Sequence, residues 1–214
     1  MKPDVTYIKI GNKKYVNVIN KRSLEILKIE EDTIGFKFPT ERASIAYMKN
    51  LETIILPKSL ESFDITNGFY GCTKLSKIIV EGDDENTKFH LPENIGKIAG
   101  PGFNGTSLTE INIGKNIKVI SIESIRNTKK LELINVDSNN EKYSSIEGVL
   151  FNKEKTILLY YPTNKNDNEY QVPETVEKIG KNAFNDCIKL KKLYIPKNVI
   201  IDGKINNSKI KEII

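Results

Sequence analysis

The apolar residues of this chain return in a fixed order along most of its length. A start of the form Leu-x-x-Φ-x-Φ, in which Φ is an apolar residue, recurs at spacings of 27, 24, 33, 23, 59 and 20 residues. Alternation of the two Φ residues is typical of a short strand with one buried face. Repeats of this length predict a solenoid of about six stacked β-containing units. The starts lie at Leu24, Leu51, Leu75, Leu108, Leu131, Leu190 and, incompletely, Ile210.

A second column of like residues accompanies the leucines. It is an apolar residue followed by proline, or once by glycine, and it suits the end of a strand because proline has no N–H to donate. Its members are Phe38, Leu56, Leu91, Ile113, Val172 and Ile195.

A third column places a bulky apolar residue shortly before the next leucine and a mostly small residue three positions later. The bulky residues are Ile45, Phe69, Phe103, Ile125, Phe184 and Ile205, and the residues after them are Met48, Cys72, Thr106, Thr128, Cys187 and Ser208. Stacked units would align each column into a continuous core. The small residues directly before the bulky ones, Gly68, Gly102, Ser124 and Ala183, predict a turn with no room for a larger side chain.

The last third of the chain carries a resemblance to a known family. Its segments Tyr143-Ser-Ser-Ile-Glu-Gly-Val-Leu-Phe-Asn152, Leu159-Tyr-Tyr-Pro162 and Val172-Pro-Glu-Thr-Val-Glu-Lys-Ile-Gly-Lys-Asn-Ala-Phe184 resemble the BspA-like class of leucine-rich repeats, and the likeness extends over residues 24–214. The resemblance implies a mostly β, right-handed leucine-rich-repeat solenoid of a kind found on bacterial or protist cell surfaces. It also implies adhesion or binding of host proteins, and a secreted or surface location.

The ends and the longest unit predict the domain organisation. Residues 6–19 hold two β-rich runs around Gly11-Asn12, so residues 1–23 are expected to form a hairpin that caps the first coil. Residues 24–214 are then a single solenoid domain, whose unfinished start at Ile210 leaves open whether the repeats continue. A second hairpin, with strands near Gly148–Phe151 and Thr156–Tyr161, is expected as an insertion in the 59-residue unit.

Strand alternation also identifies the face that is open to a partner. In each start the residues beside the first Φ point away from the core. Ile55, Ile79 and Tyr194 are then apolar groups on a polar face, an arrangement that marks an interaction surface when it is contiguous, with ordinary β-propensity as the alternative explanation. The candidate binding residues are Thr53, Ile55, Lys77, Ile79, Glu110, Asn112, Lys192 and Tyr194.

Composition narrows the classes of partner. The 33 basic residues exceed the 28 acidic ones, but only three are arginine and the lysines are interspersed with acids, which disfavours nucleic-acid binding. The sequence has no apolar run long enough to cross a bilayer and no secretory leader. We therefore expect a monomer that binds a protein, such as a host or extracellular-matrix protein, without a membrane span.

The search for chemistry finds packing residues and loops. His90 is the only histidine, which excludes a site with two histidine ligands. Cys72 and Cys187 occupy the small-residue column several coils apart, so both are predicted to be buried free thiols. The acidic run Glu81–Asn86 matches no EF-hand and is interpreted as a solvated loop, with cation binding left open. Asn104-Gly-Thr106 is a glycosylation sequon if the host cell uses such sequons.

These observations favour a non-enzymatic recognition or adhesion module that needs no cofactor or metal. One alternative is a structural spacer within a longer repeat array. A remote alternative is a glycosidase built on two carboxylates alone, which would require two facing acids in a cleft.

Overall fold

The computed structural model of the chain describes residues 4–19, 23–37, 45–61, 68–100, 102–205, 207 and 209–214. Phe38 and Ser208 of the predicted columns lie outside these residues. The chain divides into two compact units. Unit 1 comprises residues 1–108 and 116–128, and unit 2 comprises residues 109–115 and 129–214.

Unit 1 begins with the predicted hairpin, which is confirmed. Strands β1 (Val5–Ile10) and β2 (Lys13–Ile19) pair antiparallel around Gly11, whose φ of +60° suits the turn. Strand β2 then pairs in parallel with β4 (Thr33–Phe36), so the hairpin extends a sheet of the first coil. Its buried side chains include Val16 and Ile19.

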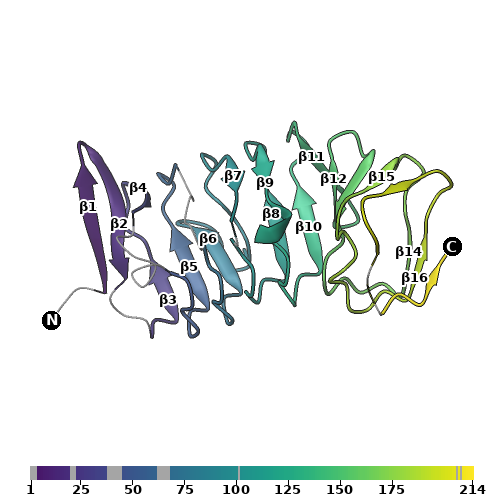
Figure 1. The fold of residues 1–214 in the computed structure, drawn as a ribbon. Helices are drawn as coiled ribbons and strands as arrows, with labels where there is room; N and C mark the ends of the chain where they lie inside the picture. Colours follow the sequence, from purple (N-terminus) through teal and green to yellow (C-terminus); the bar gives the residue numbers. More distant parts are fainter. Residues whose placement is uncertain are drawn as a thin grey trace. The chain divides into compact units, whose positions relative to one another are not determined.

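The coils of unit 1 contribute one strand each to a second sheet. In Figure 1 these strands, β3, β5 and β6, lie side by side. Their burial alternates, with Leu27, Ile54 and Ile78 turned into the core. The bounds are β3 (Ile26–Lys28), β5 (Thr53–Leu56) and β6 (Lys77–Val80), followed by the short parallel pair β7 (Lys97–Ile98) and β9 (Val119–Ile120) and a 3-10 turn at Ile122–Ser124.

Successive coils are joined by one recurring main-chain contact. At several junctions the residue before a strand offers its carbonyl oxygen to two N–H groups of the following coil. Glu25 O accepts from Glu52 N at 2.7 Å and from Thr53 N at 3.1 Å. The same double contact is made by the carbonyl oxygens of Glu52, Thr109, Asn168 and Lys191.

The bulky and small columns pack as predicted. The rings of Phe69 and Phe103 stack with centroids 6.1 Å apart. A Cβ placed on Gly68 would come within 2.7 Å of Gly102 Cα, and one on Gly102 within 2.9 Å of Ser124 Cβ. Glycine at these positions therefore lets neighbouring turns approach more closely than any side chain would allow.

Unit 2 repeats this plan with a larger second sheet. Its coil strands are β8 (Glu110–Ile113) and β10 (Leu133–Val136) in one sheet, and β14 (Glu169–Gln171), β16 (Lys192–Tyr194) and β18 (Glu212–Ile213) in another. The second sheet comprises β11 (Tyr143–Ile146), β12 (Val149–Asn152), β13 (Ile157–Tyr160), β15 (Lys178–Ile179) and β17 (Ile200–Ile201).

The predicted insertion hairpin is confirmed as β12 and β13, and β11 adds a third strand. The last strand of this ribbon belongs to the five-stranded sheet of unit 2, because β13 pairs in parallel with β15. Phe151 and Leu158 are buried in the core of unit 2. The insertion therefore supplies part of the core and part of the second sheet.

The 59-residue unit was wrongly interpreted as one coil with an insertion. Strand β14 lies inside it and pairs with β16, so the segment contains two coils. Asp167 occupies the position of the repeat leucine, three residues before the buried Tyr170 and six after Tyr161. The ring of Tyr161 lies 5.3 Å from that of Phe184, as expected of the bulky column.

The strand register of the last unit departs from the spacing of the prolines. Alignment on the prolines places Asp202 opposite Ile179, but the strand pairing places Ile201 there. Asp202 instead forms an ion pair with Lys178 at 3.0 Å. The shorter register keeps a carboxylate out of the apolar column.

The two cysteines are buried free thiols, as predicted. The Cys72 thiol donates to Ile45 O at 3.2 Å and the Cys187 thiol to Phe184 O at 3.1 Å. Burial raises the pKa of the Cys187 thiol to about 12. Both side chains therefore act as packing groups with a weak local hydrogen bond.

Candidate binding surface

The predicted open face of unit 1 is formed by β3, β5 and β6. Parallel register brings Ile26, Thr53 and Lys77 into one row and Lys28, Ile55 and Ile79 into the next. Thr53, Ile55, Lys77 and Ile79 are half-buried, whereas Ile26 is 59% exposed. Ile55 and Ile79 thus lie on adjacent rungs and form a contiguous apolar strip between lysines.

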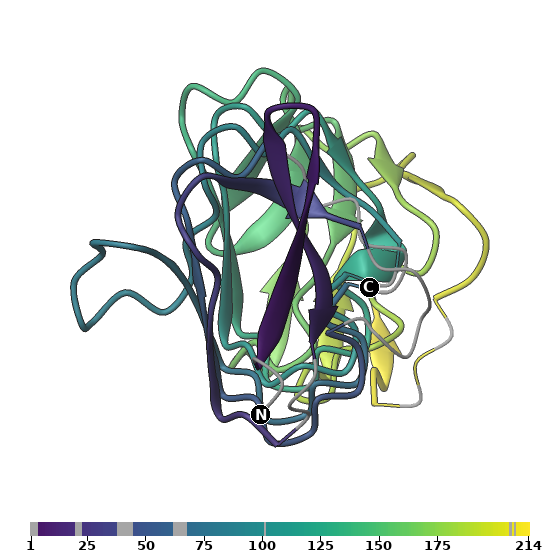
Figure 2. The same ribbon diagram turned by 90° about the vertical axis from the view of Figure 1, so that its left-hand side faces the viewer.

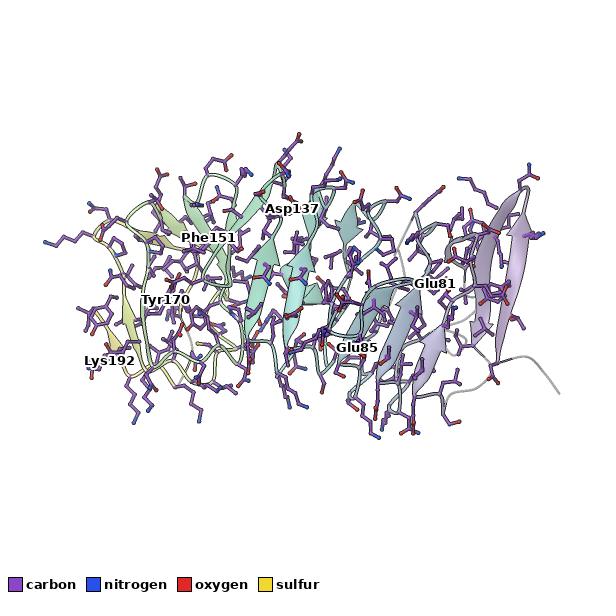
Figure 3. All side chains as sticks on the ribbon, turned by 180° about the vertical axis from the view of Figure 1, so that it is seen from behind. Glu81, Glu85, Asp137, Phe151, Tyr170 and Lys192 are labelled. Atoms are coloured by element: carbon purple, nitrogen blue, oxygen red, sulfur yellow. The ribbon has the colours of Figure 1, made fainter. Side chains whose placement is uncertain are left out.

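Both lysines of this face reach the acidic loop that follows β6. Lys28 Nζ forms an ion pair with Glu81 Oε1 at 2.5 Å, and Lys77 Nζ donates to Glu85 O at 2.7 Å. Glu81 and Glu85 are labelled in Figure 3, and Figure 2 shows the loop, in blue, extending away from the coils of unit 1. The loop therefore borders the apolar strip on one side.

A pair of carboxyl groups adjoins the Lys28 ion pair. Glu81 Oε2 is buried without a donor among the described residues, and the Glu31 carboxyl is its neighbour. The neighbouring Glu81 carboxyl raises the pKa of Glu31, while the proximity of Glu31 and Lys28 lowers the pKa of Glu81. This contact links the turn after β3 to the loop after β6.

The acidic loop is held by its own hydrogen bonds. Asp83 Oδ2 accepts from Val80 N at 2.8 Å, and both Asp83 oxygens lie 2.9 Å from His90 Nδ1. Asp84 Oδ1 accepts from Asn86 N at 2.7 Å. His90 is a surface residue at the base of the loop, and its role here is to orient Asp83.

In unit 2, the face over β8 and β10 is a ladder of polar side chains. Asn135 Nδ2 donates to Asn112 Oδ1 at 2.9 Å, and Asn112 Nδ2 donates to Glu110 Oε1 at 3.3 Å. The predicted residues Glu110 and Asn112 are therefore brought together, and they satisfy one another rather than presenting free groups.

The face over β14, β16 and β18 is a charge ladder. Lys192, labelled in Figure 3, lies between Glu169 at 3.7 Å and Glu212 at 3.5 Å, and these acids raise its pKa. Tyr194 donates its hydroxyl to Glu169 Oε2 at 3.3 Å. The prediction missed Glu169 because its strand was not recognised. The Val172-Pro173 pair and Tyr161 were the available signals for that strand.

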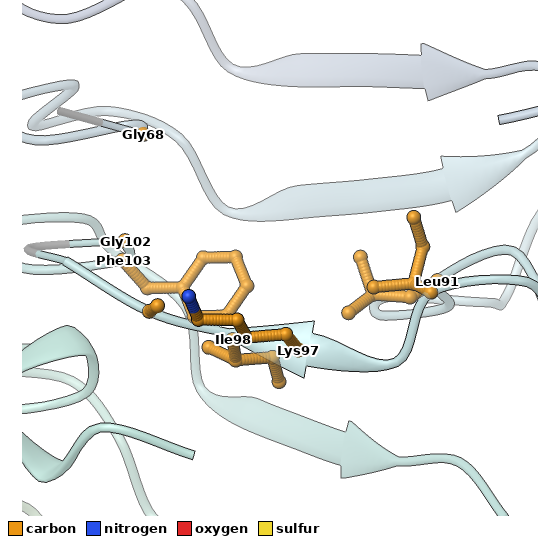
Figure 4. Close-up of a pocket in the computed structure, with 8 residues that line it drawn as sticks. Gly68, Leu91, Lys97, Ile98, Gly102 and Phe103 are labelled. Atoms are coloured by element: carbon orange, nitrogen blue, oxygen red, sulfur yellow. The ribbon is translucent and has the colours of Figure 1, made fainter. Parts of the chain in front are cut away.

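A small pocket lies in unit 1 between β7 and the bulky column (Figure 4). It has room for about one water molecule. It is lined by Gly68, Leu91, Ile95, Lys97, Ile98, Ala99, Gly102 and Phe103. Its size and apolar lining mark it as a packing gap rather than a substrate site.

The sequon at Asn104 is built into the packing. The Thr106 hydroxyl is buried and donates to Phe103 O at 2.7 Å. In the folded chain this hydroxyl is therefore engaged inside the turn.

In the part of the chain that the structure describes, no three His, Cys, Asp or Glu side chains gather closely enough to hold a metal ion. Over the same described ranges, no helix has the length and apolar character to span a membrane.

Stacked coils with one strand each, aligned leucine and aromatic columns and a shared sheet face define a leucine-rich-repeat β-solenoid. The model of the BspA type leucine-rich repeat region, with six copies, matches residues 4–88, 42–167 and 155–214. The chain therefore belongs to the BspA-type leucine-rich-repeat family.

Solved structures show the same fold. A leucine-rich repeat protein from Eubacterium ventriosum aligns with a TM-score of 0.65 at 20% identity, over 99% of this chain and 70% of its own. The pneumococcal vaccine antigen PcpA aligns with a TM-score of 0.65 at 24% identity, over 99% of this chain and 59% of its own. A leucine-rich cell surface protein from Faecalibacterium prausnitzii aligns with a TM-score of 0.50 at 17% identity, over 100% and 75%. No curated protein matches the chain.

Proposed function

We propose that this chain is a non-enzymatic recognition module, displayed on the cell surface or secreted, that binds a protein through the sheet face of unit 1. The observation that carries the proposal is the strip of Ile55 and Ile79, which ends at Lys28 in its own row and has the exposed Ile26 in the neighbouring row. Apolar groups with a polar rim are the usual composition of a protein-binding patch.

The other sheet faces support this choice by contrast. In unit 2, Lys192 is shared by two acids and Asn112 is bonded to Asn135 and Glu110. A partner would have to break these contacts to use those side chains, at the cost of desolvating each one. The unit 1 face offers apolar area without that cost.

The family and its relatives support the location. A solved relative is described as a cell surface protein and another as a vaccine antigen, both from bacteria. A host or extracellular-matrix protein is the partner class that fits such a display. Of the two neighbouring carboxyls Glu31 and Glu81, Glu81 forms an ion pair with Lys28 rather than lining a substrate pocket, which supports a role in structure over one in catalysis.

The test replaces the strip without removing β-branching. Ile55→Thr with Ile79→Thr should weaken binding to an immobilised extracellular-matrix protein at least about tenfold, because central apolar contacts dominate such interfaces. A panel of purified matrix proteins measured by surface plasmon resonance would show it. The hydroxyl variants keep the strand propensity of isoleucine, so the fold should persist by circular dichroism.

Leu133→Thr on β10 is the matched control and should leave binding unchanged. If it weakens binding while the double variant does not, the partner uses the face of unit 2 and the assignment to unit 1 is wrong. If the unaltered protein binds no member of the panel, the partner class is wrong.

A further inference from the structure

Tyr47 has an unusual backbone for its size. It lies in the turn before the strand β5, two residues after the bulky Ile45, with φ of +61°. A bulky side chain in the left-handed region is an outlier that the surrounding structure must hold in place. The equivalent residues of the next three coils, Gly71, Gly105 and Asn127, are of the types that adopt this conformation readily, with φ of +71°, +79° and +55°.

The strained turn holds an aromatic ring in solvent. Tyr47 is 59% exposed, and its ring meets that of Tyr70 edge to face with centroids 5.3 Å apart. Gly71 lies directly beside it, since a Cβ there would come within 2.8 Å of Tyr47 Cδ1. Because residue 71 is glycine, the Tyr47 ring can lie close to its backbone. The Tyr70 ring contacts the Tyr47 ring edge to face.

The same turn position continues as a row of amide and glycine groups. Tyr47 N donates to Tyr70 O at 2.8 Å, and Gly71 N donates to Asn104 O at 3.2 Å. Asn127 Nδ2 donates to Asn104 Oδ1 at 3.2 Å. We call this row the tyrosine ridge; its members are Tyr47, Tyr70, Gly71, Asn104, Gly105 and Asn127.

The chemistry of the tyrosine ridge indicates an uncharged, hydroxyl-rich ligand. The turn of each of these four coils contains the two residues that follow the bulky residue of the third column. Among these residues Arg126 is the only charged one, and its guanidinium is paired with Glu123 at 3.1 Å. An aromatic face suits the apolar face of a pyranose ring, and amide groups suit its hydroxyls, since each amide both donates and accepts. Stacked strands repeat every ~4.7–4.9 Å, which is close to the length of one β-1,4-linked pyranose.

We propose that the tyrosine ridge binds a neutral linear polysaccharide laid across the turns of unit 1, with one sugar stacked on Tyr47 and later sugars hydrogen-bonded by Asn104 Nδ2 and Asn127 Oδ1, the amide atoms that do not take part in the bond between these two residues. The ridge lies in the turns that precede the sheet strands and is separate from the strip of Ile55 and Ile79. The two ligands therefore use different residues.

The test uses the full chain and neutral oligosaccharides derived from chitin, cellulose, xylan and mannan, each measured by isothermal titration calorimetry. At least one should bind. Tyr47→Gly should weaken that binding about tenfold or more, because it removes the stacking ring. The same change relieves the left-handed strain, so the unfolding midpoint should be unchanged or higher.

Tyr47→Phe keeps the ring and should retain binding, while Ile188→Ser removes an exposed apolar side chain of unit 2 and should have no effect. Failure of every neutral oligosaccharide to bind overturns the proposal. So does a Tyr47→Gly variant that binds as well as the unaltered protein.

Discussion

Single residues decide how closely the turns of unit 1 stack. Gly68 has φ of +47° and lies so near Gly102 that any Cβ would collide with backbone atoms, which cannot move away as a flexible side chain could. Gly11 has a similar φ of +60° but open space around it, and Gly114 has open space without a left-handed backbone. A comparison of the three glycines therefore distinguishes the steric cost of an added Cβ from the cost of placing a side chain on a left-handed backbone.

Alanine at these glycines should therefore have three different effects on the free energy of unfolding. Gly11→Ala should cost about 1–2 kcal/mol for the left-handed backbone alone. Gly68→Ala should cost more, by a further ~1–3 kcal/mol for overpacking. Gly114→Ala should be neutral or stabilising by up to ~1 kcal/mol, because it restricts the unfolded chain.

Urea denaturation of the three variants is the measurement. Equal losses for Gly68→Ala and Gly11→Ala would show that the turns of unit 1 can spread apart without cost, against the close packing described for this column.

At the scale of elements, unit 2 shows how a coil can survive the loss of its leucine. Asp167 in the leucine position accepts a hydrogen bond from the Tyr161 hydroxyl at 2.9 Å and forms an ion pair with Lys165 at 3.1 Å. Tyr170, which follows on β14, is buried with a hydroxyl that has no partner among the described residues. One buried hydroxyl of this coil is satisfied and the other is not.

The two tyrosines should respond oppositely to loss of the hydroxyl. Tyr161→Phe should cost about 1 kcal/mol, because it removes a hydrogen bond to a carboxylate. Tyr170→Phe should be neutral or stabilising, because it removes a buried polar group that the core leaves unpaired.

Thermal or urea unfolding of both variants gives the comparison, and each variant is the control for the other. A clear loss of stability in Tyr170→Phe would mean that its hydroxyl has a partner, such as a buried water.

The same coil marks where sequence patterns stop being informative. Columns of leucine, phenylalanine and small residues were predictable because stacking imposes like residues on every coil. Strand β14 was missed because Asp167 reads as a surface residue, and its contact with Tyr161 depends on packing that a pattern does not contain. The open face was predictable from alternation, but the ion pair from Lys28 to Glu81 spans two strands and a loop and appears only in the fold.

At the scale of the whole molecule, the core of unit 2 contains three ionisable side chains, Cys187, Tyr161 and Tyr170, whose pKa is raised mainly by burial. Burial raises the pKa of the Cys187 thiol from 9.0 to about 12. Burial also raises the pKa of Tyr161, with the Asp167 carboxylate adding to the effect, and burial raises the pKa of Tyr170. Each group is held in its neutral form by the fold.

Stability should therefore fall steeply in alkali. A pKa raised in the folded state contributes stability that is fully present below the unfolded value and is lost as pH rises through the folded value. For Cys187 this window runs from pH 9 to about 12. The part of the tyrosinate absorbance that the Tyr161→Phe and Tyr170→Phe variants lose should appear together with the change in circular dichroism, because these two side chains ionise only as unit 2 unfolds.

A thiol reagent provides the check at milder pH. Folded protein should leave both cysteines unlabelled, and unfolded protein should label both. Prompt labelling of Cys187 in the folded protein would contradict the burial that underlies the alkaline prediction.

The double acceptance of two N–H groups by one carbonyl, repeated from Glu25 to Lys191, involves main-chain atoms alone. These particular bonds do not depend on which side chains the two coils carry. A gene for such a chain can gain, lose or exchange a coil while each remaining junction keeps its bonds. Surface residues such as Ile55 or Tyr47 can then be placed on different coils without changing these main-chain bonds.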